Sequence, residues 1–145
     1  MKSSRTKPLR LFLLLLAAFT LTNAAELKIE KCKEGDWEDE IGYRAAVRVD
    51  QTLYISGVAA SGEMPAAVRE TYDGLAKILK AHGLTFKNVV KENIYTTNLD
   101  ALKANQKLRL SYYGKDFPAA TWVQVQRLYM PDHVIEVALI AVFPE

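Results

Sequence analysis

The chain has 145 residues, enough for one ordinary domain, and half of them are hydrophobic, so a core can be buried. Its formal net charge of +2 arises from residues 1–24, which hold four of the 19 basic residues and none of the 17 acidic ones. The remainder, with 15 basic and 17 acidic residues, carries a formal charge of −2. No basic patch is left, which argues against a nucleic-acid partner.

The N-terminal segment has the layout of a secretory signal. Four basic residues precede the uncharged run LFLLLLAAFTLTNAA, whose small residues suit cleavage after Ala24 or Ala25. This run has 15 residues, whereas a membrane-spanning helix needs about 20. We therefore predict a signal peptide over residues 1–24, a single domain over residues 25–145, and an exported protein, periplasmic or secreted, without a stable membrane anchor. An uncleaved anchor is the less favoured alternative.

The rest of the chain alternates between strand and helix patterns. In chain order, the expected elements are a short strand at 27–31, an acidic loop at 33–40, a hairpin of strands 42–50 and 52–60, a helix at 65–83, a strand at 88–97, a helix from Asn98 to about Tyr113, and strands at 120–128 and 133–143. Strands joined mostly by hairpins, with helices inserted, predict an α+β domain of order β-β-β-α-β-α-β-β. Its mixed sheet should carry both helices on one face.

Such a sheet leaves its second face without a helical cover. Alternation places Ala120, Trp122 and Gln124 on one side of the 120–128 strand, and the last strand is apolar on both sides. Apolar faces of this kind are usually buried against another subunit. We therefore expect an oligomer whose interface covers the face that bears Trp122 and Gln124.

Several kinds of site have no support in the sequence. There is no GxGxxG or GxxxxGK[ST] motif for a nucleotide phosphate. His82 and His133 are far apart, HExxH and CxxC are absent, and Cys32 is the only cysteine, so we expect no metal, no cofactor and no internal disulfide. Cys32 could be free or pair between chains. His133 should be exposed, and residues 91–93 should form a solvated or interface part of their strand.

Three segments occur in a specific order and spacing. They are IGYRAAVRVDQTLYISGVAASG (41–62), GLTFKNVVKENIYTTNLD (83–100) and FPAATWVQVQRLYMPDHVIEVALIAV (117–142). Together they resemble the Rid family, also called YjgF-type enamine/imine deaminases. The resemblance implies a chorismate-mutase-like fold and a homotrimer with the helices outside. It also implies small-molecule sites in the clefts between subunits.

The resemblance also implies roles for individual residues. In deaminating members an arginine after a Pro-Ala pair holds the carboxylate of a 2-imino acid, and a glutamate on the last strand helps position the attacking water. The glutamate corresponds to Glu136, and Tyr43, Ser56 and Gly57 correspond to residues that line the cleft. The arginine position is occupied by Ala120.

Two further cleft positions depart from the family pattern. The family's asparagine on the second helix corresponds to Asn105 or Gln106, depending on which of two adjacent tyrosines takes the family's aromatic position. Trp122, two residues beyond Ala120, is a bulky residue for a cleft wall.

Two functions are therefore open. The first is a deaminase-type hydrolase, with Glu136 as its catalytic residue, that acts on a substrate other than the usual 2-imino acids. Alanine cannot make the bidentate carboxylate contact, whose loss typically costs about 2–5 kcal/mol. The second is a non-catalytic trimeric module in which Tyr43 and Trp122 stack on a neutral or apolar ligand. Ala120 is expected on the strand beside Glu136, so Ala120→Arg should restore a cation there.

Overall fold

The structure is a computed structural model that describes residues 26–145. The predicted signal, residues 1–24, lies outside the described residues, and its cleavage stays a prediction. Within the described range, no helix has both the length and the apolar character needed to cross a membrane.

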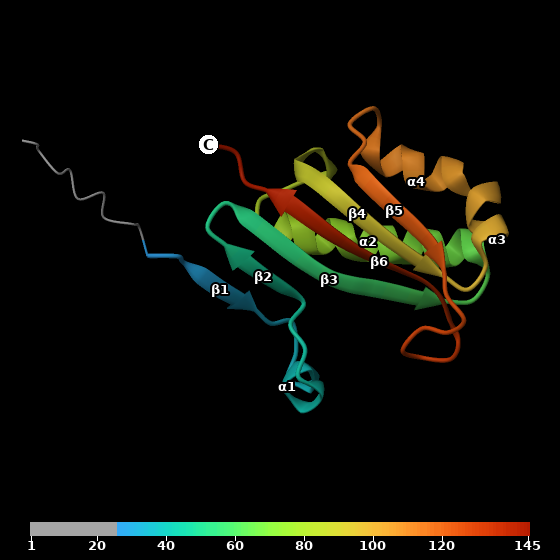
Figure 1. The fold of residues 1–145 in the computed structure, drawn as a ribbon, viewed down its shortest axis with the longest axis horizontal. Helices are drawn as coiled ribbons and strands as arrows, with labels where there is room; N and C mark the ends of the chain where they lie inside the picture. Colours follow the sequence, from blue (N-terminus) through green and yellow to red (C-terminus); the bar gives the residue numbers. More distant parts are fainter. Residues whose placement is uncertain (1–25) are drawn as a thin grey trace, which may run out of the picture.

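A six-stranded mixed sheet forms the centre of the domain, in the order β1-β2-β3-β6-β4-β5 (Figure 1). Its strands are β1 (Ile29–Cys32), β2 (Ala46–Val49), β3 (Thr52–Ser61), β4 (Val89–Thr96), β5 (Ala119–Gln124) and β6 (His133–Val142). Neighbouring strands are antiparallel except β4 and β5, which are parallel. The predicted α+β class is confirmed. However, β5 ends earlier than predicted, and residues 125–132 leave the sheet as a loop.

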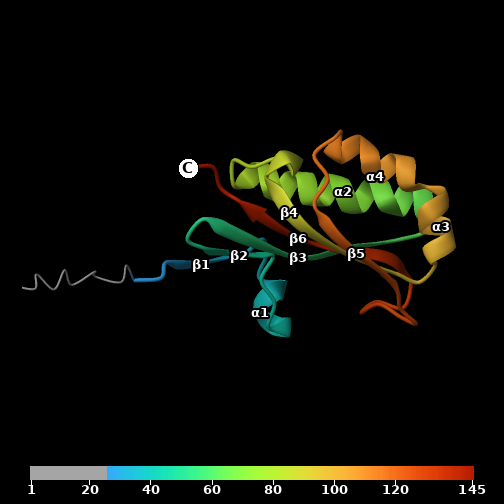
Figure 2. The same cartoon turned by 45° about the horizontal axis from the view of Figure 1, so that its top comes forward.

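The helical segments are α1 (Trp37–Ile41), α2 (Met64–Ala81), the 3-10 turn η1 (Phe86–Asn88), α3 (Leu99–Ala104) and α4 (Gln106–Tyr113). Figure 2 shows α2, α3 and α4 on one side of the sheet, as predicted, and α1 on the other. The predicted second helix is divided into α3 and α4 at Asn105. The Asn105 amide donates a hydrogen bond to the carbonyl of Ala101 (2.9 Å), within its own helix.

The helix α1 replaces part of the predicted acidic loop, and a buried carboxylate explains it. Glu38 is fully buried and accepts hydrogen bonds from the backbone N–H groups of Glu34 (2.7 Å) and Ala45 (3.2 Å). Gly42, in the left-handed region at φ 71°, ends the turn. The Glu38 carboxylate thus holds the segment against the sheet by binding backbone N–H groups. The acidic composition of the segment does not show that one of its carboxylates is buried.

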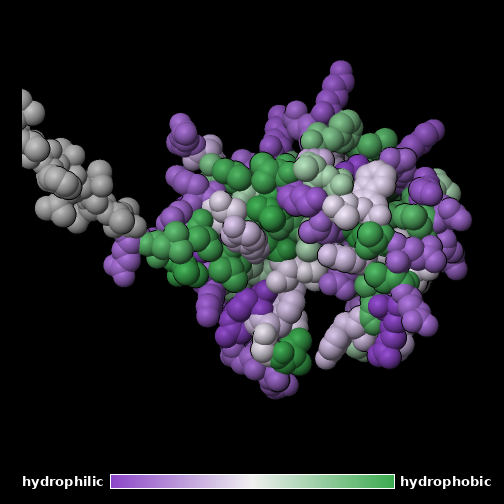
Figure 3. Space-filling view, viewed as in Figure 1, coloured by the Kyte–Doolittle hydropathy of each residue, from purple (hydrophilic) through white to green (hydrophobic). Residues whose placement is uncertain are grey.

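The sheet face opposite α2 has no helical cover in the described chain apart from α1. It is the face turned to the viewer in Figures 1 and 3, and apolar side chains gather over its strands. Tyr54, Tyr95 and Val123 are exposed on it. Trp122 was predicted to share this face, and that prediction is wrong. In register, Trp122 lies opposite Ile94, which is buried beneath the helices, so the indole points to the helical side.

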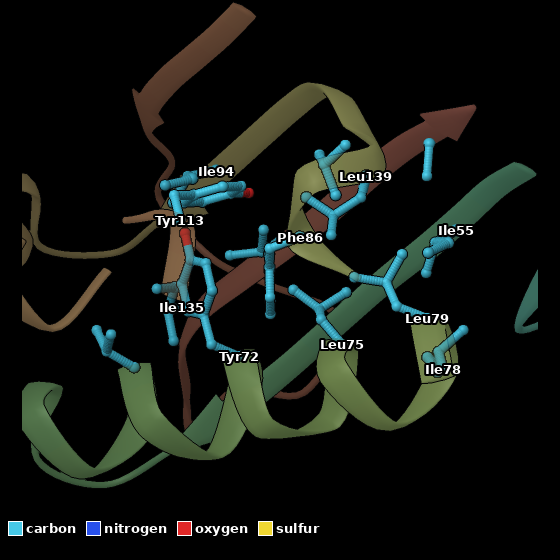
Figure 4. Close-up of a cluster of buried hydrophobic side chains, with 14 of the residues drawn as sticks. Ile55, Tyr72, Leu75, Ile78, Leu79, Phe86, Ile94, Tyr113, Ile135 and Leu139 are labelled. Carbon is cyan, nitrogen blue, oxygen red and sulfur yellow. The ribbon is translucent and has the colours of Figure 1, made fainter. Parts of the chain in front are cut away.

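The core lies between α2 and the sheet. Tyr72, Leu75 and Leu79 of α2 are fully buried and point toward strand residues such as Leu139 (Figure 4). Burying such side chains contributes about 1.5–3 kcal/mol each before entropy is counted. Gly83, with φ 72°, follows the end of this helix, where the sequence places a cap. The helices thus occupy one face of the sheet, which leaves the other face free to form a site.

Candidate functional site

A groove of about 650 Å³ lies on the uncovered face of the sheet. Its floor consists of Gly57 and Ala59 of β3 and of Glu136 and His133 of β6. Ala59 and Glu136 face each other directly in the antiparallel β3–β6 ladder. The groove therefore sits where two adjacent strands place a carboxylate on an otherwise apolar surface.

The helix α1 and the loop between β5 and β6 form the walls of the groove. One wall carries Trp37 and Ile41 of α1 with Tyr43 beyond them, and the other carries Tyr129 and Met130 from the β5–β6 loop. The space-filling view shows the molecule hollowed between these two segments (Figure 3). Sequence reasoning identified Tyr43 but missed the other wall residues, because α1 lies mostly in the predicted acidic loop, and Tyr129 and Met130 lie in the connection between two predicted strands.

The Glu136 side chain lies directly against the backbone of Gly57. A β-carbon at position 57 would overlap Oε1 of Glu136 and stand 2.7 Å from its Cδ and Cγ atoms. The β3–β6 register is irregular between Ile55 and Val58, which places this glycine in a local bulge. Among residues 26–145, no hydrogen bond or ion pair to the Glu136 carboxylate is found, so its oxygens are open to water or a ligand.

Tyr43 joins the wall to the floor. Its hydroxyl donates a hydrogen bond to the Gly57 carbonyl (3.2 Å), and its ring stacks on Trp37 at a centroid distance of 5.4 Å. Burial raises the pKa of Tyr43, and the nearby Glu136 charge raises it further. The phenol therefore stays protonated at neutral pH and serves as a hydrogen-bond donor. The next residue, Arg44, is held by Asp39 (2.6 Å) and supplies no free cation to the groove.

Two other polar residues near the groove differ in whether their side chains are already hydrogen-bonded within the chain. The Ser56 hydroxyl donates to the Arg44 carbonyl (2.7 Å), so it is used within the β2–β3 pair. His133 was expected to be exposed. Instead it is half-buried in the groove, and its Nδ1 atom is buried without a hydrogen-bond partner in the described chain. His133 is thus a groove residue that sequence reasoning did not single out.

The remaining predicted site residues lie elsewhere in the same chain. The prediction that Ala120 lies on the strand beside Glu136 is wrong, because β4 separates β5 from β6. Ala120 is in register with Glu92, whereas Glu136 is in register with Tyr95, and successive residues of β4 face opposite sides. An arginine at position 120 would therefore not meet Glu136 of the same chain.

Ala120 is exposed on the α4 side of the sheet, in register with the buried Glu92. Gln106 lines a small gap there with Arg109 and Trp122. Asn105, the alternative position for the family's asparagine, uses its amide within α3. Of the two residues, Gln106 is therefore the one beside Trp122.

A buried ion pair lies under this region, where solvated residues were expected. Glu92 is fully buried and receives Arg109 Nη2 (2.6 Å) and Nε (2.8 Å), the hydroxyls of Tyr72 (2.7 Å) and Tyr113 (2.8 Å), and the indole N–H of Trp122 (3.3 Å). The Arg109 guanidinium also lies 4.8 Å from the Trp122 ring centre. Burial disfavours the charged form of Arg109, but contact with Glu92 outweighs it and raises the pKa. The pair is therefore neutral overall and offers no free cation.

This cluster should make the fold sensitive to alkali. Burial, with the Glu92 charge as second cause, raises the pKa of Tyr72 and of Tyr113 well above the ordinary value. Unfolded tyrosines lose their protons near pH 10, whereas these two stay protonated in the folded protein. Their contribution to the free energy of unfolding is therefore complete below that pH, and above it the free energy of unfolding falls by about 1.4 kcal/mol per pH unit for each residue. Urea unfolding between about pH 9 and pH 11 measures the slope. Tyr113→Phe should flatten it, whereas Tyr129→Phe, at an exposed position, should not.

Comparisons with known proteins agree with this arrangement. The family model described as Endoribonuclease L-PSP matches residues 38–143, which include the floor of the groove and its wall residues except Trp37. The chain is 33% identical over 109 residues to mouse 2-iminobutanoate/2-iminopropanoate deaminase, covering 69% of this chain and 80% of that protein. It is 35% identical over 95 residues to the goat protein of the same name, covering 59% and 69% respectively.

The fold is similar to a solved structure as well. The crystal structure of a YjgF/YER057c/UK114 family member from Mycobacterium tuberculosis matches with a TM-score of 0.73 and 25% identity, over 79% of this chain and 99% of that one. The resemblance inferred from the sequence is confirmed, and with it the chorismate-mutase-like fold. No group of three or more potential metal ligands occurs among residues 26–145. The chain belongs to the family of the Endoribonuclease L-PSP model, which is the YjgF or Rid family.

Proposed function

We propose that this protein is an enamine/imine hydrolase of the deaminase type that acts on a substrate other than the usual 2-imino acids. The observation that carries the proposal is the Glu136 carboxylate, which lies on the groove floor with no partner among the described residues. Relatives named 2-iminobutanoate/2-iminopropanoate deaminase support the reaction type.

The chemistry needs a group that moves protons beside an apolar pocket. Water adds to the C=N carbon: a C–O bond forms, the π electrons move to nitrogen, and Glu136 carries a proton from the water to that nitrogen. The amino alcohol then collapses as Glu136 carries the hydroxyl proton to nitrogen, the C–N bond breaks, and a carbonyl compound and ammonia leave. The carboxylate is regenerated, and the apolar walls limit competing water.

The substrate differs from the usual one because Ala120 cannot bind a carboxylate. Arginine makes a bidentate contact with a carboxylate, and an alanine side chain has no donor. Losing such a contact typically costs about 2–5 kcal/mol. We therefore expect imines that lack a carboxylate to be better substrates than 2-imino acids.

The proposal includes a homotrimer, which the resemblance implies. In one chain, Glu136 and the Gln106–Trp122 region face opposite sides of the sheet, so a second copy is needed to bring them to one cleft. The exposed Tyr54, Tyr95 and Val123 on the uncovered face support such an interface. We also propose export, for which mass spectrometry of the exported protein should find residues 1–24 or 1–25 removed.

The alternative is a trimeric module that binds a ligand without converting it. The stacked Trp37 and Tyr43 rings and the apolar opposite wall favour it, because such walls suit binding whether or not chemistry follows. Trp122 was predicted to stack on the ligand, but in this chain its indole is bound to Glu92 on the helical side.

Glu136→Gln distinguishes the two functions. An amine oxidase generates carboxylate-free imines and an amino-acid oxidase generates 2-imino acids, and ammonia release above the spontaneous rate is measured for each. We expect the parent to accelerate the former more than the latter, and Glu136→Gln to lose about 100-fold or more of the rate, because an amide cannot accept the proton. Glu70→Gln, which removes an exposed carboxylate from α2, is the matched control.

Light scattering and circular dichroism accompany these assays. They should show that parent and variants have the same fold and the mass of a trimer. A parent that never exceeds the spontaneous rate with either imine would overturn the hydrolase in favour of the binding module. A stable monomer of about 13–14 kDa (~110 Da per residue) would contradict the proposed cleft between subunits.

A further inference from the structure

We propose that the groove binds a small organic monocation, an ammonium or iminium group on an apolar or aromatic body. Glu136 would hold its charge, and the aromatic wall would hold its body. This deepens the proposed function by naming the charged form of its substrate. Turnover of such a cation rests on the proposed hydrolase activity, but its binding does not.

The charge of the groove is the first argument. Glu136 is the one acidic residue that lines it, and neither lysine nor arginine does among the residues that the structure describes. The nearest sequence candidate, Arg44, is paired with Asp39. A half-buried carboxylate without a counter-ion makes the local potential negative, and apolar walls strengthen it by excluding water. An anionic ligand would be repelled there, and a cation would be attracted.

The aromatic wall is the second argument. Trp37 is 51% exposed and Tyr129 is 75% exposed, although such large rings are ordinarily mostly buried. Trp37 stacks on Tyr43 at 26° between planes, so this wall presents aromatic surface beside the carboxylate. Aromatic faces carry negative charge density and attract cations, tryptophan most strongly. A carboxylate together with exposed indole and phenol rings is thus suited to an organic cation.

The third argument comes from the residues that stand where the family has its cation. In the proposed assembly, the edge that closes the cleft carries Ala120 and Gln106, and both are uncharged. Arg109, which lies beside Gln106, is neutralised by Glu92. Lys103, the other cation that lines this gap, lies 3.8 Å from Asp100, so each of the two cations beside Gln106 has an acidic partner in the described chain. Replacing arginine by alanine changes the preferred charge of the ligand as well as removing a contact.

Cation binding also suits the proposed reaction. A protonated imine is more electrophilic at carbon than the neutral form. Its nitrogen is already protonated and positively charged, so it accepts the π electrons without a further proton transfer. Water adds to the iminium carbon, and Glu136 takes the proton released from the water. It returns that proton to nitrogen, and the C–N bond then breaks as the hydroxyl proton passes to Glu136. The departing ammonia takes this second proton, so that a carbonyl compound and ammonium are formed and the carboxylate is regenerated. Mass and charge balance with water as the sole co-reactant.

Three stable probes of similar size and different charge test the proposal. Calorimetry at low salt and about pH 8, where an ordinary imidazole is neutral, measures binding of benzyltrimethylammonium, benzyl alcohol and phenylacetate to the parent protein. We expect the cation to bind about tenfold or more tightly than the alcohol, and phenylacetate to bind more weakly than the alcohol. Added salt should weaken binding of the cation and leave that of the alcohol nearly unchanged.

Variants assign the preference to the groove. Glu136→Gln should reduce the cation's advantage over the alcohol to about threefold or less, and Trp37→Leu should reduce it in part, while Glu70→Gln should leave it intact. Trp37→Leu keeps the test decisive if Glu136→Gln perturbs the fold. The proposal is overturned if phenylacetate binds as tightly as the cation, if Glu136→Gln retains the preference in a folded protein, or if no probe binds at about 10 mM.

The same data separate this proposal from the hydrolase. Cation preference without imine turnover would overturn the proposed reaction and support the cation site. Turnover that depends on Glu136 without any preference for the cation would support the proposed reaction and overturn the cation site.

Discussion

Arg109→Leu should lower the free energy of unfolding by about 3–5 kcal/mol, the loss that is usual when one partner of a buried ion pair is removed. The Arg109 side chain is 6% exposed and Glu92 is fully buried, so water cannot replace the lost guanidinium. The carboxylate would keep the hydroxyls of Tyr72 and Tyr113 but lose its only cationic partner in the described chain. Urea unfolding followed by far-ultraviolet circular dichroism measures the loss.

A double substitution shows whether the loss comes from the unpaired charge. Glu92→Leu combined with Arg109→Leu removes both charges, so it should be more stable than Arg109→Leu alone, although the two tyrosine hydroxyls then lack an acceptor. Lys107→Leu removes an exposed cation from the same helix and should change stability by less than about 0.5 kcal/mol. If Arg109→Leu behaved like Lys107→Leu, the buried pair would not contribute as described.

This ion pair shows where sequence reasoning stops. The strands and helices were predicted because their signals are local: alternation for the strands, and an apolar stripe with terminal proline and glycine for α2. Glu92 and Arg109 are 17 residues apart, on a strand and a helix. In the sequence, Glu92 stands between Lys91 and Asn93, and Arg109 stands between Leu108 and Leu110, so neither has an acidic or basic partner within its own segment that marks it as buried. Their contact follows from packing α4 against β4, which no short window of sequence contains.

The candidate site shows the same limit. Three of its residues, Glu136, Tyr43 and Gly57, were predicted from the family resemblance, and they line one groove. Strand order was not predicted. Two strands that follow each other closely in sequence were expected to be neighbours, but β5 pairs in parallel with β4 instead. Because of this pairing, Trp122 points away from the groove, and β4 separates Ala120 from Glu136. The pairing register of a strand decides which of its side chains lie on each face of the sheet.

Under the proposed hydrolase function, Gly57→Ala should lower the rate of imine hydrolysis by about 100-fold or more, and it should lower the free energy of unfolding by about 1–3 kcal/mol. The added methyl group would occupy the space of the Glu136 carboxylate, because an ideal β-carbon stands 2.7 Å from its Cδ atom. Either the carboxylate swings out of the groove or β3 shifts, and in both cases the oxygens of Glu136 move. Adding Glu136→Ala removes the overlap, so the double variant should regain the stability but not the activity.

Ala59→Gly is a matched control at the groove floor for stability, since it changes one methyl group on the same strand without meeting the carboxylate. If Gly57→Ala kept full activity in a folded protein, then the position of Glu136 against Gly57 would not matter for turnover, and the groove floor would have to be assigned a different catalytic group.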